Sequence, residues 1–218
     1  MTTELTRARQ LDAADPLAPM RGRFKLPGGV IYLDGNSLGP LPLATVERQR
    51  DMLERQWGEG LIRSWNDADW IDAPTRIGGK IARLIGAKPN EVLVADSVSV
   101  NIFKLLVAAA QLSPDRTQIL SESGNFHTDL HIASGAAELM PDMRLDVVDR
   151  GALVDAIGPQ TNVALLTHVH YKTAERFDMA AITARAADVG ARIVWDLSHS
   201  VGAVPLDLNG CGAELAVG

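Results

Sequence analysis

The sequence has one cysteine, few aromatic residues and no long uninterrupted hydrophobic run. The single cysteine, Cys211, excludes an internal disulfide and is typical of a reducing compartment. The apolar stretches are broken by polar residues such as Lys104 and Asp196, so none reaches the ~18 residues of a membrane-spanning helix. The N-terminal residues mix acidic and basic side chains and lack the apolar core of a signal peptide. We therefore predict a cytoplasmic protein without a membrane segment.

The chain also lacks a strong excess of charge. Its 27 acidic and 21 basic residues give a formal net charge of −6, which disfavours nonspecific binding to nucleic acid or to anionic membranes. Of its 218 residues, 46% are hydrophobic and 22% are charged, a composition typical of a globular chain with a sizeable core. Nucleic acids and membranes are therefore not expected as partners.

Residues 1–90 predict an N-terminal arm and the start of a small domain. The expected elements are a helix over 3–15, a short strand over 30–33, a helix from about Pro42 to Trp57, and a helix that ends at Gly86. The segment 58–74 between the last two helices is predicted to be irregular. It is rich in tryptophan, with Trp65 and Trp70.

From Glu91 onward, strand and helix patterns alternate. Short runs of Val, Ile and Leu between helical stretches are typical of a mostly parallel sheet with helices on both faces. The predicted strands are 91–95, 118–121, 145–148, 163–167 and 192–195, with another beginning near Glu214. The predicted helices are 100–111, 127–139, 153–157 and 179–189. We therefore predict that residues 91–218 form the first, incomplete part of a large three-layer α/β/α domain.

Four polar segments follow predicted strands, and open α/β sheets bind ligands at the carboxyl ends of their strands. In the first segment, Asp96–Asn101, Ser97 or Ser99 can cap a helix whose free backbone N–H groups suit a phosphate. The segment lacks the glycine spacing of a Walker loop or a dinucleotide fingerprint. A serine that serves only as a helix cap is the alternative.

The second segment, Gly124–His131, follows the next predicted strand. Phe126 and Asp129 are three residues apart and share one helix face, where the aromatic ring can stack on a flat ligand. A Phe126 side chain in the core is the alternative. His127 and His131 have the spacing of a helical zinc pair, but no glutamate follows His127 and a third ligand is needed.

The third and fourth segments follow the last two buried strands. His168 and His170 alternate at a predicted strand end, so their side chains are expected to point the same way, as ligands or as ordinary polar residues. Asp196 is an acid at the end of a buried strand, where an unpaired carboxylate is costly. A protonated heteroaromatic nitrogen or a structural arginine would neutralise it.

Four runs along the chain together resemble the kynureninases. They are Tyr32–Pro40 (YLDGNSLGP), Ser99–Asn101, Gly124–Phe126 with Asp129, and Trp195–Ala203 (WDLSHSVGA). The first and last runs are specific in combination, and the resemblance covers the chain from Val30 onward. It implies fold type I of the class-V-aminotransferase-like enzymes and pyridoxal 5′-phosphate as the cofactor. The implied reaction of tryptophan degradation hydrolyses kynurenine or 3-hydroxykynurenine to alanine and anthranilate or 3-hydroxyanthranilate.

The resemblance implies roles for residues on the phosphate and ring sides of the cofactor. Val98 and Ser99 would hold the phosphate at a helix N-terminus. Phe126 would stack on the pyridine ring, and Asp129 would belong to its hydrogen-bonded surroundings. His127 departs from the family, which often has proline at this position.

Further residues are implied at the ring nitrogen and at the substrate. Asp196 would bind the pyridinium nitrogen, and Thr167 and His199 would border the cofactor. Ser37 would line the substrate side, with Trp65 a weaker candidate there.

The lysine that binds the cofactor covalently in this family comes shortly after the Asp-x-x-His stretch. No lysine of this chain follows Asp196, so we expect that residue beyond Gly218. We therefore expect an N-terminal portion of an enzyme, inactive alone, that forms a homodimer in its full-length form. The alternatives are another class-V enzyme such as a cysteine desulfurase, a metal-dependent hydrolase built on the histidines, and a non-catalytic remnant.

Overall fold

The structure is a computed structural model that describes residues 3–218. It divides into two compact units, the first ending at Ile71 and the second spanning Asp72–Gly218. The predicted boundary near residue 90 refers to the domains of a longer enzyme and stays a prediction. Among the described residues, no helix is long and apolar enough to cross a membrane.

The first unit is mainly helical. Its elements are α1 (Thr3–Ala14), η1 (Ala18–Arg23), β1 (Phe24–Lys25), β2 (Leu41–Pro42), α2 (Leu43–Asp51), the π-helix η2 (Met52–Gly60), η3 (Leu61–Arg63) and α3 (Ser64–Asp67). Strands β1 and β2 pair antiparallel. The predicted helix to Trp57 is therefore formed by α2 and η2 together.

Two predictions for the first unit are wrong. Residues 30–33 are not a strand, and Ile31 and Leu33 are almost fully exposed. An extended apolar run becomes a strand only where another strand pairs with it, and β1 and β2 pair with each other instead. The segment 58–74 is not irregular throughout, because η2, η3 and α3 occupy much of it.

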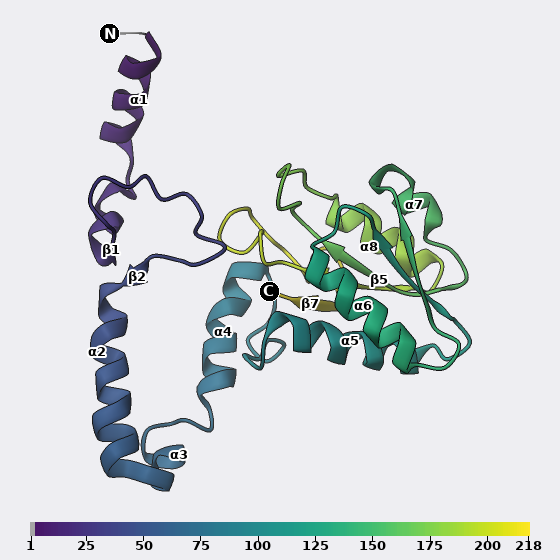
Figure 1. The fold of residues 1–218 in the computed structure, drawn as a ribbon, viewed down its shortest axis with the longest axis horizontal. Coiled ribbons are helices and arrows are strands. Elements are labelled where there is room, and N and C mark those ends of the chain that lie inside the picture. Colours follow the sequence, from purple (N-terminus) through teal and green to yellow (C-terminus); the bar gives the residue numbers. More distant parts are fainter. Residues whose placement is uncertain (1–2) are drawn as a thin grey trace. The chain divides into compact units, whose positions relative to one another are not determined.

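The second unit contains a five-stranded parallel sheet, as predicted. Its strands are β3 (Gln118–Glu122), β4 (Arg144–Val148), β5 (Thr161–Thr167), β6 (Arg192–Asp196) and β7 (Leu215–Val217). Their order in the sheet is β4-β3-β5-β6-β7, and every neighbouring pair is parallel. Every residue of the central strand β5 is buried, because helices cover both faces of the sheet (Figure 1).

The helices of the second unit form the two outer layers. They are α4 (Ala73–Ile85), α5 (Val98–Leu112), α6 (His127–Leu139), α7 (Leu153–Ala156) and α8 (Met179–Asp188), with the short 3-10 turn η4 (Arg150–Ala152) before α7. Alternate residues of β5 face opposite layers. Val163 and Leu165 join one core with α5 and α6, whereas Ala164 and Leu166 join the other with α7 and α8. The predicted three-layer α/β/α architecture is confirmed.

The predicted strand over 91–95 is absent. Leu93 and Val94 are exposed, at 63% and 42%, although the sequence of this segment has the apolar character of a strand. Within the part of the chain that the structure describes, the sheet ends at β4 on one side and at β7 on the other. Residues 91–95 therefore lack a neighbouring strand with which to form backbone hydrogen bonds.

Candidate functional site

The carboxyl ends of β3, β5 and β6 bring the predicted acidic residues together. Because these strands are parallel neighbours, the segments that follow them lie at one edge of the sheet. Thr167 and Asp196 end β5 and β6 and are paired in register. Both side chains are buried, as is Asn125 in the turn after β3. The result is a polar cluster with little access to water.

Asp196 accepts hydrogen bonds on both carboxylate oxygens. Oδ1 accepts from the backbone N–H of Ser198 at 2.8 Å and from its hydroxyl at 2.6 Å. Oδ2 accepts from the Thr167 hydroxyl at 3.1 Å. No arginine or lysine among residues 3–218 forms an ion pair with it, so a structural arginine does not neutralise this acid.

Asn125 was not predicted as a site residue, yet it connects the strands of the cluster. Its amide nitrogen donates to Ser121 Oγ at 3.0 Å and to the Leu165 carbonyl at 3.1 Å. Its amide oxygen accepts the Phe126 N–H at 2.7 Å and the Thr167 hydroxyl. The signal in the sequence was an amide residue in the strand-to-helix turn directly before Phe126.

Asp129 adds a second buried acid to the cluster. Its pKa is raised from 3.8 to about 7, mainly by burial and also by the nearby charge of Asp196, while a hydrogen bond from Thr167 opposes both effects. Its Oδ2 atom is buried and has no hydrogen-bond partner in the described chain. The single hydroxyl proton of Thr167 therefore faces acceptors on Asn125, Asp129 and Asp196. The cluster has more acceptors than donors, so a positively charged donor would fit it.

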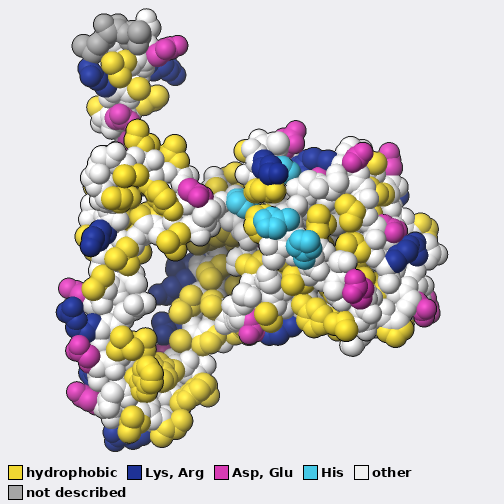
Figure 2. All heavy atoms as spheres, viewed as in Figure 1, with side chains coloured by type: hydrophobic (Ala, Val, Ile, Leu, Met, Phe, Trp, Pro, Cys, Tyr) yellow, Lys and Arg dark blue, Asp and Glu magenta, His cyan; other side chains and the backbone are white. Residues whose placement is uncertain are grey.

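Aromatic side chains lie beside this cluster. The Phe126 ring precedes α6 and lies 5.2 Å from Tyr171 and 6.5 Å from His199, between ring centroids. Neither core cluster of the described residues includes Phe126, which argues against the interpretation of this ring as a core residue. Figure 2 shows histidine side chains gathered on one face of the second unit. The site can therefore offer an aromatic surface to a flat ligand.

The N-terminus of α5 supplies free backbone donors. Ser97 is the N-cap, and its hydroxyl oxygen accepts the Val100 N–H at 3.4 Å, so Ser99 is not the cap. The N–H groups of Val98 and Ser99 belong to the first turn and have no intrahelical acceptor. Such a helix end favours an anion, which suits the predicted phosphate role of both residues.

The two histidines after β5 have different neighbours, and their common direction stays a prediction. The strand ends at Thr167, and a bend follows at residue 168. His168 is buried, and its Nδ1 atom lies 2.8 Å from Ser200 Oγ. His170 instead lies near Gly124. Among the described residues, no three His, Cys, Asp or Glu side chains are grouped to hold a metal.

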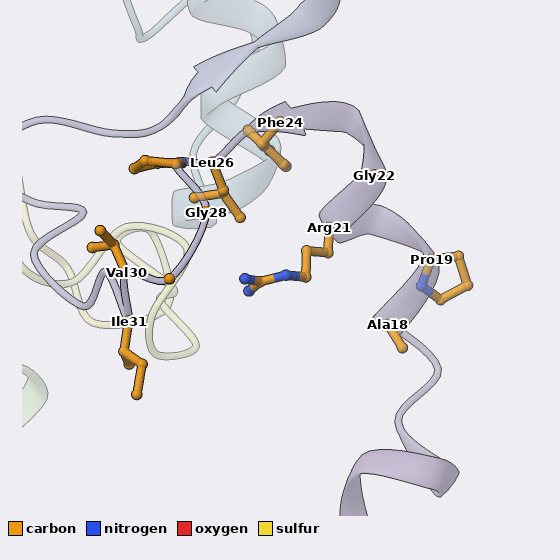
Figure 3. A pocket seen from close by; sticks show the side chains of 11 residues that line it. Ala18, Pro19, Arg21, Gly22, Phe24, Leu26, Gly28, Val30 and Ile31 are labelled. Carbon is orange, nitrogen blue, oxygen red and sulfur yellow. The ribbon is translucent and has the colours of Figure 1, made fainter.

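The predicted substrate residues lie in the first unit. Ser37 is exposed in a turn, where its N–H bonds to Asp34 Oδ1 at 3.4 Å, and Trp65 in α3 is half-exposed. This unit also contains a hollow of about 790 Å³, into which the Arg21 side chain points (Figure 3). Its other lining residues are apolar or glycine, so it has no acid or base comparable to the Asp196 cluster. The roles of Ser37 and Trp65 stay predictions.

Solved structures confirm the fold class. A cystine C–S lyase, C-DES, determined as a K223A mutant with glycine covalently linked to the cofactor PLP, superposes with a TM-score of 0.74 at 19% identity. The match covers 88% of this chain and 53% of that one. The cysteine desulfurase CsdA from Escherichia coli superposes with a TM-score of 0.72 at 18% identity, over 91% of this chain and 53% of CsdA.

Curated sequences give a closer relationship, although no family model matches the chain. Kynureninase from Burkholderia mallei (strain SAVP1) is 50% identical over 217 residues, which is 97% of this chain and 52% of that protein. Kynureninase from Pseudomonas fluorescens is 50% identical over 214 residues, which is 95% of this chain and 51% of that protein. The chain spans about half the length of these relatives. Nearly the whole chain is therefore similar to about half the length of these kynureninases.

Proposed function

We propose that this chain is the part of a kynureninase that binds the ring and phosphate of pyridoxal 5′-phosphate. The enzyme would hydrolyse kynurenine or 3-hydroxykynurenine to alanine and anthranilate or 3-hydroxyanthranilate. The observation that carries the proposal is the pair of buried acids, Asp129 and Asp196, with which no described lysine or arginine forms an ion pair. The 50% identity to kynureninases supports the same assignment.

Asp196 would hold a proton on the ring nitrogen of the cofactor. Two hydrogen bonds from Ser198 fix one carboxylate oxygen. Thr167, which can also donate to Asn125 or Asp129, leaves the other oxygen able to accept from a ligand. Burial strengthens the attraction between this carboxylate and a protonated nitrogen. When bound, the protonated cofactor ring acts as an electron sink for the reacting carbon of an amino-acid substrate.

The remaining predicted residues would bind the other parts of the cofactor. Val98 and Ser99 would donate backbone N–H groups to the phosphate at the N-terminus of α5. Phe126 would pack on one face of the ring, and the nearby His199 would border it. Ser37 would contact the substrate.

Titration of the chain with pyridoxal 5′-phosphate, followed by equilibrium dialysis, tests the assignment. We expect Asp196→Asn to raise the dissociation constant at least tenfold, because the neutral amide no longer stabilises the protonated nitrogen. Glu138→Gln, an equivalent change on the exposed surface of α6, should leave it within twofold. Equal affinities for the parent and Asp196→Asn would contradict the proposal.

A cysteine desulfurase is a weaker proposal, although enzymes of that kind share the fold. Such an enzyme needs a reactive thiolate. Burial raises the pKa of the Cys211 thiol, and the charges of Asp207 and Asp178 raise it further. The only cysteine of this chain is therefore kept protonated rather than activated.

We also propose that the full-length protein is a cytoplasmic homodimer. Trp57, Ile62 and Trp65 expose apolar surface on the first unit, and exposed apolar patches mark interaction sites. Replacing Trp57 and Trp65 by serine should shift the full-length protein toward the monomer in sedimentation velocity. An unchanged sedimentation coefficient would contradict this interface.

A further inference from the structure

Glu122 is a buried acid outside the Asp196 cluster, and one of its oxygens has no partner. It is the last residue of β3, and only 1% of it is exposed. Its Oε1 atom accepts a hydrogen bond from Arg150 Nη1 at 2.7 Å, whereas Oε2 has no hydrogen-bond partner among the described residues. A buried carboxylate oxygen without a donor is costly, so a nearby donor has a large effect on this side chain.

The imidazole of His170 approaches this oxygen beside Gly124. A Cβ atom built on Gly124 would lie 2.9 Å from His170 Nε2 and 3.6 Å from Glu122 Oε2. The ring and the carboxylate therefore both lie close to Gly124. A separation of 2.9 Å is shorter than real Cβ contacts, so only glycine at position 124 leaves the ring in its place.

Main-chain hydrogen bonds determine which nitrogen of His170 carries the proton. Nδ1 accepts the backbone N–H groups of Lys172 and Thr173, both at 3.2 Å. A ring nitrogen that accepts hydrogen bonds carries no proton, so the proton of the neutral ring is on Nε2. The donor of His170 is therefore Nε2, the atom that lies near Gly124.

Arg150 is the donor that binds the other oxygen of Glu122. Its guanidinium group lies 3.5 Å above the Phe177 ring centroid and can only donate hydrogen bonds. Glu122 thus has two groups nearby that both require an acceptor. A carboxylate has two acceptor oxygens, whereas the amide of a glutamine would turn an NH₂ group toward Arg150 or toward His170.

We propose that Glu122 is a positioning residue that ties the loop 169–175 to the end of β3 through His170 and Arg150. Tyr171 connects this arrangement to the site, because its ring stacks on His170 at 5.4 Å and contacts Phe126 at 5.2 Å. Glu122 thereby holds the aromatic surface beside which the cofactor ring would lie. Only this last step rests on the proposed function.

Hydrogen exchange and histidine NMR on the chain test the tie itself. The ¹⁵N shifts of His170 should show a proton on Nε2 in the parent. Glu122→Gln should speed amide exchange at Lys172 and Thr173 at least tenfold. Glu214→Gln is the matched control, because Glu214 also lies 3.8 Å from an arginine, Arg192, but is exposed and outside this loop. It should leave the exchange at Lys172 within twofold.

If Glu122→Gln does not fold, Gly124→Ala provides the same test and leaves the Glu122–Arg150 pair in place. Its new Cβ would displace the His170 ring, so it should also speed exchange at both amides at least tenfold. A proton on Nδ1 of His170, or unchanged exchange in Gly124→Ala, would overturn the proposal.

Dialysis with pyridoxal 5′-phosphate tests the link to the site. If the parent binds the cofactor, Gly124→Ala should bind it at least threefold more weakly. Equal binding would remove the connection through Tyr171. If the parent itself does not bind, the proposed function fails, whereas the exchange data still decide the role of Glu122.

Discussion

The two units of this chain differ in how they bury apolar surface. Every hydrophobic side chain buried in the described chain belongs to the second unit, from Ala82 to Val217. In the first unit the only buried residue among those described is Ser64, while Leu53 and Trp57 are exposed. Burial of apolar surface is the main favourable term in folding. Burial of apolar side chains therefore stabilises the second unit. It contributes little to the stability of the helices in the first unit.

Two leucine-to-alanine substitutions test this contrast most directly. Leu166→Ala removes a fully buried side chain from β5 and should lower the free energy of unfolding by about 2–5 kcal/mol. Leu53→Ala removes a half-exposed side chain from η2 and should change it by less than about 0.5 kcal/mol. Urea denaturation measures both values. Equal losses would show that the two units share one core.

The pH dependence of stability should come mainly from Asp129 in the second unit. Its pKa is about 7 in the folded chain and ordinarily 3.8, so the folded state binds an extra proton between these values. The contribution of Asp129 to the free energy of unfolding is therefore largest below pH 4, and it falls as the pH rises to about 7. The full shift corresponds to roughly 4 kcal/mol as an upper bound.

Asp129→Asn should remove this dependence and raise the stability at pH 8. Urea midpoints at pH 5 and pH 8 measure the effect for the parent and the variant. Asp12→Asn, an equivalent change on the exposed α1, is the matched control and should leave the pH profile unchanged. A parent that is equally stable at both pH values would contradict the raised pKa.

Helix capping should give the smallest effect. Ser97→Ala removes the N-cap of α5 and should cost about 1 kcal/mol. Ser99→Ala in the same helical turn should cost clearly less, because Ser99 is not the cap. Thermal denaturation distinguishes the two variants. In the first unit, α2 begins after Pro42 without a side-chain cap, so no serine offers a comparable test there.

Burial and strand pairing together explain which parts of the fold were predictable from the sequence. Helix α6 and strands β3, β5 and β6 were located to within two residues, because buried parallel strands are apolar runs bounded by polar turns. The strands expected over 30–33 and 91–95 have the same local pattern but do not form. A strand forms only when a second segment pairs with it. The local sequence pattern describes one segment and does not show whether a partner exists.

The residues of the candidate site that follow from the order and direction of the strands were predictable. Asp129, Thr167 and Asp196 meet because parallel strands place their carboxyl ends together. Asn125 was missed because its role depends on hydrogen bonds to β5, which is distant in sequence. The different neighbours of His168 and His170 were not predictable, because they depend on the residue at which β5 ends.

The half-titrated Asp129 has a calorimetric consequence. A cation that enters the cluster beside Asp196 would lower the pKa of Asp129, because it favours the ionised carboxyl group. Since that pKa is about 7, binding of the cation near pH 7 would release part of a proton from Asp129 into the solution. The heat of association should therefore vary with the ionisation enthalpy of the buffer, being different in Tris and in phosphate at the same pH.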